Sequence, residues 1–250
     1  MFAQNQLADF EAIWNREIAW FEPPNECRGG WSGVAKLILQ GTEGKVLDLF
    51  IKKQENYGRR AKLPPFKVEP TFRREFNTLI KLEKLGFGAP KAVYYAEKLS
   101  KGQLQAILIT CNLADYFPLD TLNSPASLEM TLLKKRTLIQ CIATEIKRFH
   151  QLGFVHRALY AKHIFVKPVQ QTFEIALIDF EKCRRTFFTV FMPIADLITL
   201  NYRTKDWTNT SRLHFFKSYF EVKKLNFFYR WLLVYIVKKS NKKQRHMSKI

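Results

Sequence analysis

The chain has 250 residues, of which 47% are hydrophobic and 25% are charged, so it is long enough to bury a core of its own. Its 41 Lys and Arg residues outnumber 22 Asp and Glu residues and give a net charge of +19, which predicts a polyanionic partner such as nucleic acid, anionic lipid or a phosphorylated glycolipid. The four cysteines have no C-x-x-C spacing, which argues against a disulfide framework or zinc site and predicts reduced thiols in the cytosol.

The first residues, Met1 to Gln6, lack a basic region followed by an apolar one, so we expect no secretory signal. The first predicted element is an amphipathic helix over residues 7–20, which Pro23 and Pro24 end. Its apolar side chains recur near helical spacing and are Leu7, Phe10, Ile13, Trp14 and Ile18.

A glycine-rich segment follows at residues 28–33 and contains Gly29, Gly30 and Gly33. Glycines allow a tight turn and a close approach of backbone N–H groups to phosphate oxygens. The same composition is also common in ordinary turns. Two strands are predicted after it, over residues 34–40 and 45–53, with a turn at Gly41 to Gly44.

The second of these strands ends on two lysines, Lys52 and Lys53. Strand alternation directs them to opposite faces of the sheet, so only one of them can face a given ligand. We favour Lys52 as the ligand-facing residue and keep Lys53 as the fallback. Both could instead be solvated lysines at a strand edge.

A basic, turn-rich loop covers residues 56–67, and Arg59, Arg60 and Lys62 in it could meet an anionic acceptor or simply be solvated. Pro70 then begins a predicted helix. This helix carries Glu75 and, further on, Glu83. Strands are predicted over residues 91–96 and 104–111, and the second strand runs into Asn112.

A long helix is predicted over residues 127–151, with Leu132, Leu133, Leu138 and Ile139 on its apolar side. A loop rich in His, Arg and Lys follows Gly153. Two apolar runs, at residues 164–166 and 175–178, predict the strands of a hairpin.

The second run of this hairpin ends on Asp179. A carboxylate at a strand end suits a Mg²⁺ ion that bridges phosphates. Glu181 could add an oxygen ligand or pair with Lys182. A further helix is predicted from Met192 and carries Asp196.

The C-terminal end is first aromatic and then basic. An apolar run over residues 231–237 is far shorter than the ~20 residues that a spanning helix needs. Lys238, Lys239, Lys242, Lys243 and Arg245 follow it. Two interpretations remain open: an interfacial helix on an anionic inner-leaflet surface, or a core helix followed by a disordered tail.

The loop and hairpin together resemble the catalytic half of a protein kinase, whose loop reads H-R-D-L-x-x-x-N and is followed by Asp-Phe-Gly. Here the loop reads H-R-A-L-x-x-x-H and the later motif reads Asp-Phe-Glu. The frame matches at His156, Arg157, Leu159 and Asp179.

The sequence departs from this frame at Ala158, which replaces the base aspartate, and at His163, which replaces the second metal-binding asparagine. The histidine, with Ile-Phe-Val after it, resembles the bacterial lipopolysaccharide kinase family, the Kdo and heptose kinases. The Leu-Tyr-Ala-Lys-His run is most similar to the InaA-type branch. The resemblance covers roughly residues 27–220.

This resemblance implies an α+β fold, a protein-kinase-like two-lobed domain with a small β-rich N-lobe and a mainly helical C-lobe. The expected bounds are about 25–113 for the N-lobe, about 114–237 for the C-lobe and 238–250 for a basic tail. The implied cofactors are ATP and Mg²⁺. His156 and Arg157 are expected to organise the loop rather than to react, and Asp196 to tie the loop to the lobe.

The resemblance also implies a site. Lys52 holds nucleotide phosphates, Glu75 positions Lys52, with Glu83 as the alternative, and Asn112 lies in the hinge whose backbone reads adenine. The expected catalytic residues are Lys52, Glu75, His163 and Asp179; the nucleotide-binding residues are Gly29, Gly30, Gly33, Lys52 and Asn112; and the metal ligands are Asp179 and His163.

The implied function is an ATP-dependent phosphotransferase that acts on a Kdo or heptose sugar of the lipopolysaccharide core. We expect it in the cytoplasm, in peripheral contact with the inner face of the cytoplasmic membrane. Because Ala158 cannot accept a proton, the alternative is a pseudokinase that binds nucleotide and regulates an envelope or stress response. A nucleic-acid binder ranks last, since only the charge favours it.

Overall fold

The computed structural model describes residues 5, 7, 9–27, 29–41, 44–60, 68–122, 130–186, 192–204 and 206–247. The chain divides into two compact units, Met1–Ala114 and Asp115–Ile250. Each unit is described by itself. The first is built on a β-sheet and the second is mainly helical, as the predicted kinase-like fold class requires.

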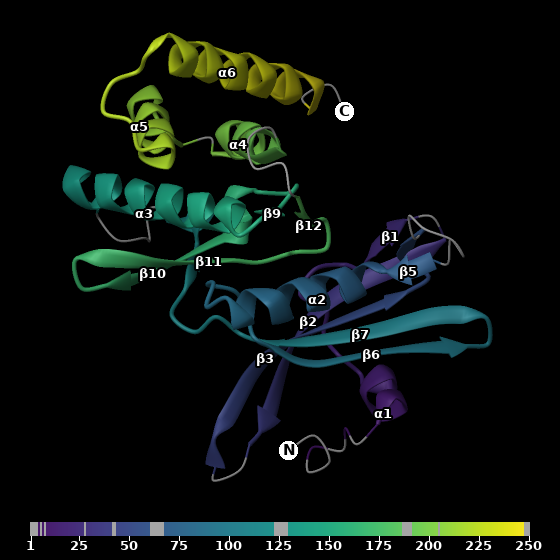
Figure 1. Ribbon diagram of the computed structural model, residues 1–250. Coiled ribbons are helices and arrows are strands. Elements are labelled where there is room, and N and C mark those ends of the chain that lie inside the picture. The colour runs from purple at the N-terminus through teal and green to yellow at the C-terminus, as the bar shows by residue number, and fades with distance from the viewer. Residues whose placement is uncertain are drawn as a thin grey trace. The chain divides into compact units, whose positions relative to one another are not determined.

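The first unit contains a five-stranded antiparallel sheet in the order β1-β2-β3-β7-β6 (Figure 1). Its strands are β1 (Asn25–Cys27), β2 (Gly30–Gln40), β3 (Val46–Glu55), β6 (Ala92–Ser100) and β7 (Gln103–Cys111). Two short strands, β4 (Gly58–Arg60) and β5 (Val68–Pro70), form a separate pair. The side chains of Arg59 and Arg60, and all of Lys62, lie outside the described residues.

Helices cover the two faces of this sheet, α2 (Thr71–Lys84) on one side and α1 (Phe10–Asn15) on the other (Figure 1). The core on the α1 side joins apolar side chains of the helix region and of three strands. It consists of Leu7, Ile13, Ala35, Leu37, Leu39, Leu49, Ile51, Ile107 and Ile109. On the other side, α2 buries Phe72, Leu79 and Leu82.

The predicted helix over residues 7–20 is wrong beyond Asn15. The helix begins after Asp9, whose side chain accepts a hydrogen bond from the Ala12 N–H, and it ends at Asn15. Trp20 then forms a β-bridge with Ala35. The indoles of Trp14 and Trp20 both pack against Trp31, so ring packing on the sheet replaces further helical turns.

The predicted glycine loop is also wrong for two of its three glycines, because Gly30 and Gly33 lie within β2. A Cβ atom on Gly33 would stand 2.6 Å from the Trp20 ring, and one on Gly30 would stand 2.4 Å from the Asn56 backbone. Close packing therefore requires glycine at both positions. Gly29 alone lies in the turn between β1 and β2, with a φ of +77°.

Lys52 and Lys53 take opposite sides of the sheet, as strand alternation predicts. Lys53 is 3% exposed, and its Nζ donates to the carbonyl oxygens of Trp14 and Arg16 at 2.8 and 2.9 Å. It thus binds the end of α1, where carbonyls have no helical partners. Burial, together with the charge of Arg16, lowers the pKa of Lys53 to about 8.

The second unit is organised around α3 (Leu132–Gln151). On one side of α3 lies the hairpin of β10 (Ile164–Val169) and β11 (Thr172–Leu177), and on the other lie α5 (Asn209–Phe220), α4 (Met192–Arg203) and α6 (Phe227–Met247) (Figure 1). The hairpin confirms the sequence prediction. The short elements are β8 (Phe117–Pro118), β9 (Phe154–Val155), β12 (Arg184–Arg185) and the 3-10 turns Leu119–Thr121 and Ala161–His163.

Two predictions for this unit need correction. The α3 helix begins at Leu132, behind a Thr131 cap, and Leu132 and Leu133 are 82% and 75% exposed rather than part of the apolar side. The basic residues 238–245 do not form a disordered tail, because α6 continues to Met247; residues 248–250 of the predicted tail lie outside the described residues. Among the described residues, no helix is both long enough and apolar enough to cross a membrane.

The position of Lys53 predicts a pH-dependent contribution to stability. Between pH 8 and 10.5 the unfolded chain holds the Lys53 proton and the folded chain releases it, so stability rises with pH. The difference in unfolding free energy between the wild type and Lys53→Met should therefore be constant below about pH 8. Above that pH the unfolding free energy of the wild type should increase relative to that of the variant. Urea titrations from pH 7 to 10 measure this difference, and a constant difference across the range would contradict the buried amine.

Candidate active site

In the first unit, Lys52 and Glu75 form an ion pair on the face of the sheet that α2 covers. Lys52 Nζ lies 2.8 Å from Glu75 Oε1 and 2.9 Å from Oε2. The side chains are 15% and 4% exposed. A bidentate, largely buried pair holds the ammonium at one place, while the residual exposure of Lys52 leaves it able to meet a further anion.

The sequence fixes this pair through the start of α2. Gln54, two residues after Lys52 on the same face, accepts hydrogen bonds from Thr71 Oγ1 at 2.9 Å and from the Phe72 N–H at 3.2 Å. These bonds anchor the first turn of the helix to β3. One turn further along, Glu75 then lies over Lys52. Glu83 instead pairs with Lys91 at the surface, so it is not the partner of Lys52.

Asn112 does not present its N–H groups to a ligand. Its backbone N–H donates to Asp48 O at 2.9 Å and its side-chain Nδ2 donates to Asp48 Oδ2 at 2.8 Å. Both contacts join the end of β7 to the start of β3. The backbone N–H of Asn112 is therefore engaged within the sheet, and the prediction that the backbone of this hinge reads adenine stays a prediction for its other backbone groups.

In the second unit, Asp196 on α4 holds the backbone of the loop after β9. Its Oδ2 accepts from the His156 N–H at 2.6 Å and its Oδ1 from the Arg157 N–H at 2.7 Å. His150 Nε2 lies 3.2 Å from Oδ2. Burial alone raises the pKa of Asp196, but the bonds from His150 and the charges of both histidines outweigh it and lower the pKa.

His163 and Asp179 meet at the other end of this loop. His163 Nδ1 lies 2.8 Å from Ala158 O, and since a carbonyl only accepts, this nitrogen carries the proton. Burial lowers the pKa of His163 to about 4. The neutral ring therefore directs the lone pair of Nε2 at Asp179 Oδ2, which is 3.3 Å away.

Two electron-pair donors that face each other in this way are suited to a shared cation. Among the described residues, no group of three or more His, Cys, Asp or Glu side chains gathers as a metal site. A Mg²⁺ ion needs only one or two protein ligands when substrate phosphates and water supply the others. The His163–Asp179 pair fits that requirement, although a nitrogen is an unusual ligand for Mg²⁺.

The backbone adopts a left-handed conformation at two positions of the loop region, Arg157 and Asp179. Arg157 has a φ of +65° and Asp179 a φ of +64°, values that non-glycine residues rarely adopt and that surrounding contacts must hold. The hydrogen bond from the Arg157 N–H to Asp196 supplies one such contact. The ring of Phe180, which is fully buried between Phe149 and His156, supplies another for Asp179.

Ala158 is 1% exposed, and its carbonyl accepts from His163 and from the Tyr160 N–H at 2.8 Å. The residue that replaces the base aspartate is thus buried in the loop. Its backbone oxygen orients the histidine that replaces the asparagine.

The sequence analysis missed a ring contact that supports His163. The Tyr160 ring lies 5.2 Å from the His163 ring, and the Arg203 guanidinium lies 4.7 Å from Tyr160. Arg203 ends α4, the helix that also carries Asp196. No local pattern links Tyr160 with Arg203, so only the folded chain reveals this cation–π contact.

The network around Asp196 predicts a strong effect on stability. The Asp196→Ala variant leaves the buried His156 N–H and the partly buried Arg157 N–H without their acceptor, and the loss at the buried group costs ~1–3 kcal/mol. We expect its unfolding free energy to fall by at least that amount in urea titrations. The exposed Asp206→Ala is the control and should stay within ~0.5 kcal/mol of the wild type; equal stability of the two variants would contradict this role.

Comparison with known proteins gives a consistent result. The profile of the lipopolysaccharide kinase (Kdo/WaaP) family matches residues 11–219. The chain is 29% identical over 183 residues to Protein InaA of Escherichia coli (strain K12). The aligned region covers 71% of this chain and 79% of that protein. The chain is 32% identical over 113 residues, 44% of each chain, to 3-deoxy-D-manno-octulosonic acid kinase of Haemophilus influenzae (strain PittGG).

A solved structure described as WaaP in complex with acyl carrier protein aligns with a TM-score of 0.67 at 22% identity. The alignment covers 93% of this chain and 91% of the other and supports the kinase-like fold. With the family profile spanning most of its length, the chain belongs to the Kdo/WaaP lipopolysaccharide kinase family.

Proposed function

We propose that this protein transfers the γ-phosphate of ATP to a hydroxyl group of a lipopolysaccharide core sugar, Kdo or heptose. The observation that carries the proposal is the Lys52–Glu75 pair, in which a carboxylate holds a strand lysine with both oxygens. Kinases need such a pair because the lysine must be fixed in place to stabilise phosphoryl charge. Membership of the family supports the acceptor class.

Each of the candidate residues in the two units then has a defined task. Lys52 binds nucleotide phosphates, and Glu75 keeps its ammonium oriented. Gly29, in the turn between β1 and β2, leaves the backbone free to approach the nucleotide. Asp179 and His163 would hold Mg²⁺, which when bound neutralises phosphate charge. Ala158, through its carbonyl, keeps His163 in the tautomer whose Nε2 faces Asp179.

The missing loop aspartate does not exclude phosphoryl transfer. A general base contributes typically ~10²–10⁴-fold, whereas transfer through a loose transition state depends mostly on positioning and charge stabilisation. We therefore propose a slow kinase rather than an inactive one. The acceptor is lipid-linked, so the reaction would take place at the inner face of the cytoplasmic membrane.

A pseudokinase is the second candidate, and Ala158 is the observation that favours it. In that case Lys52, Glu75 and Asp179 would bind nucleotide without turnover. The bound and free states would then differ in their interaction with another component of the cell. The two candidates agree on nucleotide binding and differ only in the chemical step.

The deciding experiment is Mg²⁺-dependent ATP consumption by the purified protein, with and without lipopolysaccharide core acceptor. We expect acceptor-stimulated turnover that falls at least ~100-fold in Asp179→Asn and in Lys52→Met. Asparagine tolerates a positive φ, so Asp179→Asn should keep the fold.

Matched controls separate loss of chemistry from loss of charge. Asp115→Asn changes a surface aspartate that also has a positive φ, of +63°, and Lys36→Met breaks a surface pair with Asp48 on the same sheet. Both should retain turnover. Nucleotide binding without turnover on any core acceptor would favour the pseudokinase, and full activity in Asp179→Asn would overturn the kinase.

A further inference from the structure

The helix α6 has two apolar faces, and only one of them is packed. Leu232, Ile236 and Ser240 are at most 4% exposed, and Ser240 Oγ donates to Ile198 O on α4. Apolar side chains on the opposite face, together with Phe228 at its flank, are open to solvent. They are Phe227 at 87%, Phe228 at 54%, Trp231 at 56% and Val234 at 50% exposure.

These exposed side chains form a continuous surface, which we name the α6 outer face. The positions 227, 231, 234, 238, 242 and 245 are three or four residues apart and therefore lie along one side of the helix. The rings of Phe228, Trp231 and Tyr235 stack in sequence, with centroids 6.4 and 5.6 Å apart. Exposed apolar surface of this kind usually marks an interaction site.

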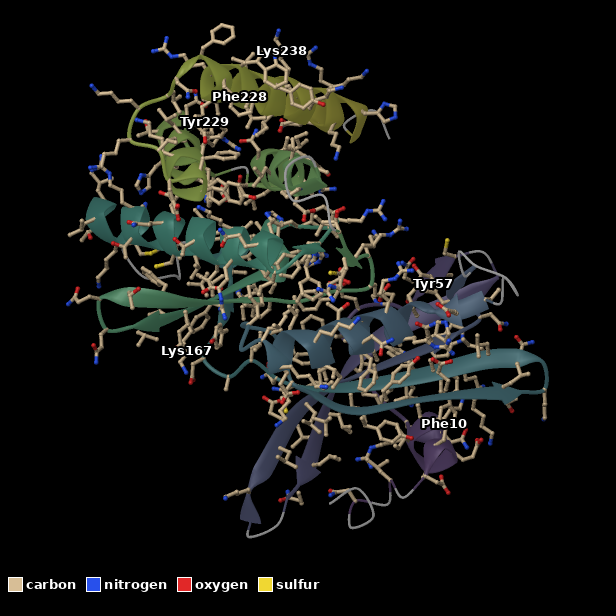
Figure 2. All side chains as sticks on the ribbon, in the orientation of Figure 1. Phe10, Tyr57, Lys167, Phe228, Tyr229 and Lys238 are labelled. Atoms are coloured by element: carbon tan, nitrogen blue, oxygen red, sulfur yellow. The ribbon has the colours of Figure 1, made fainter. Side chains whose placement is uncertain are left out.

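The second half of the same face is cationic. Lys238, Asn241, Lys242, Arg245 and His246 line an open hollow along the helix. Figure 2 shows Lys238 on the side of α6 that points away from α4. The helix sequence Phe227–Met247 contains six Lys or Arg residues (230, 238, 239, 242, 243 and 245) and no Asp or Glu.

We propose that the α6 outer face binds an anionic lipid surface. Its aromatic half enters the boundary between headgroups and acyl chains, and its cationic half lies on the lipid phosphates. The inference deepens the proposed function, on which it rests for its biological purpose, since it names the surface that brings the kinase to a lipid-linked acceptor. Lipid binding itself requires no phosphoryl transfer.

The arrangement of the face favours lipid over other polyanions. In a surface that binds single-stranded nucleic acid, cations follow the backbone while aromatic rings stack on the bases between them. Here the rings and the cations occupy separate halves of one helix. Pairing with a second copy of α6 would bring two helices without a single acidic residue together, which charge repulsion opposes.

The test is sedimentation of the full-length protein with phosphatidylcholine vesicles that contain 30% or no phosphatidylglycerol. We expect binding to the anionic vesicles that weakens with salt. Since a basic residue near such a surface contributes about fivefold, the triple variant Lys238→Glu, Lys242→Glu, Arg245→Glu should bind at least ~100-fold more weakly. The double variant Phe228→Ser, Trp231→Ser should bind more than ~10-fold more weakly.

The matched control changes three exposed cations on another helix, Lys134→Glu, Lys135→Glu and Arg136→Glu, which follow the exposed Leu132 and Leu133. This variant has the same net charge as the α6 triple variant and should bind more tightly than it. Thermal unfolding and circular dichroism establish that the α6 variants remain folded. If one triple variant unfolds, single substitutions at the same positions give the same comparison.

Three outcomes would overturn the proposal: no binding to anionic vesicles, equal loss in both triple variants, or undiminished binding in the α6 variants. A dimer that the Phe228→Ser, Trp231→Ser variant dissociates, without any vesicle binding by the wild type, would assign the face to a second copy instead. Catalytic failure remains distinguishable, because Asp179→Asn should bind vesicles like the wild type whether or not the protein is a kinase.

Discussion

A single buried carboxylate, Asp196, organises the second unit. It accepts the N–H groups of His156 and Arg157 and meets His150 on α3. His150 in turn contacts the Tyr219 hydroxyl on α5 at 2.7 Å. Three helices and the loop therefore converge on one charge. Because a buried charge is tolerated only when it is fully hydrogen-bonded, the loop has little freedom to rearrange.

The loop held in this way keeps the two proposed metal ligands, His163 and Asp179, close together although its sequence departs from the kinase frame. His163 is fixed by the Ala158 carbonyl and by the rings of Tyr160 and His156. Its free lone pair faces the Asp179 carboxylate rather than solvent. The separation of 3.3 Å between these two electron-pair donors is the observation that supports the proposed cation site.

The sequence predicted those parts of the site that depend on local periodicity. Strand alternation separated Lys52 from Lys53, and the Pro70 boundary placed Glu75 in the first turns of α2. Two apolar runs on either side of a short, mostly polar gap predicted the hairpin that ends at Asp179. These features could be predicted because each depends on neighbours within a few residues along the chain.

Features that depend on distant neighbours could not be predicted. Position 33 must be glycine because the Trp20 ring packs against it, and α1 ends where Lys53 binds its last carbonyls. Both contacts form only after the sheet is in place. The Tyr160–Arg203 contact joins residues more than forty positions apart. The exposure of Leu132 and Leu133 likewise follows from where α5 and the hairpin pack on α3, which periodicity does not reveal.

The position of α4 determines how far the α6 outer face lies from Asp179. This helix packs under α6 through Ile198 and Thr199 and holds the loop through Asp196 and Arg203. Packed helices are about 10 Å across, so two helical layers, ~20 Å, separate the α6 outer face from Asp179. If α6 lies on lipid, an acceptor sugar has to extend that far from the headgroups to meet the site. The thickness of the second unit would then determine how far from the headgroups an acceptor sugar must lie to reach Asp179.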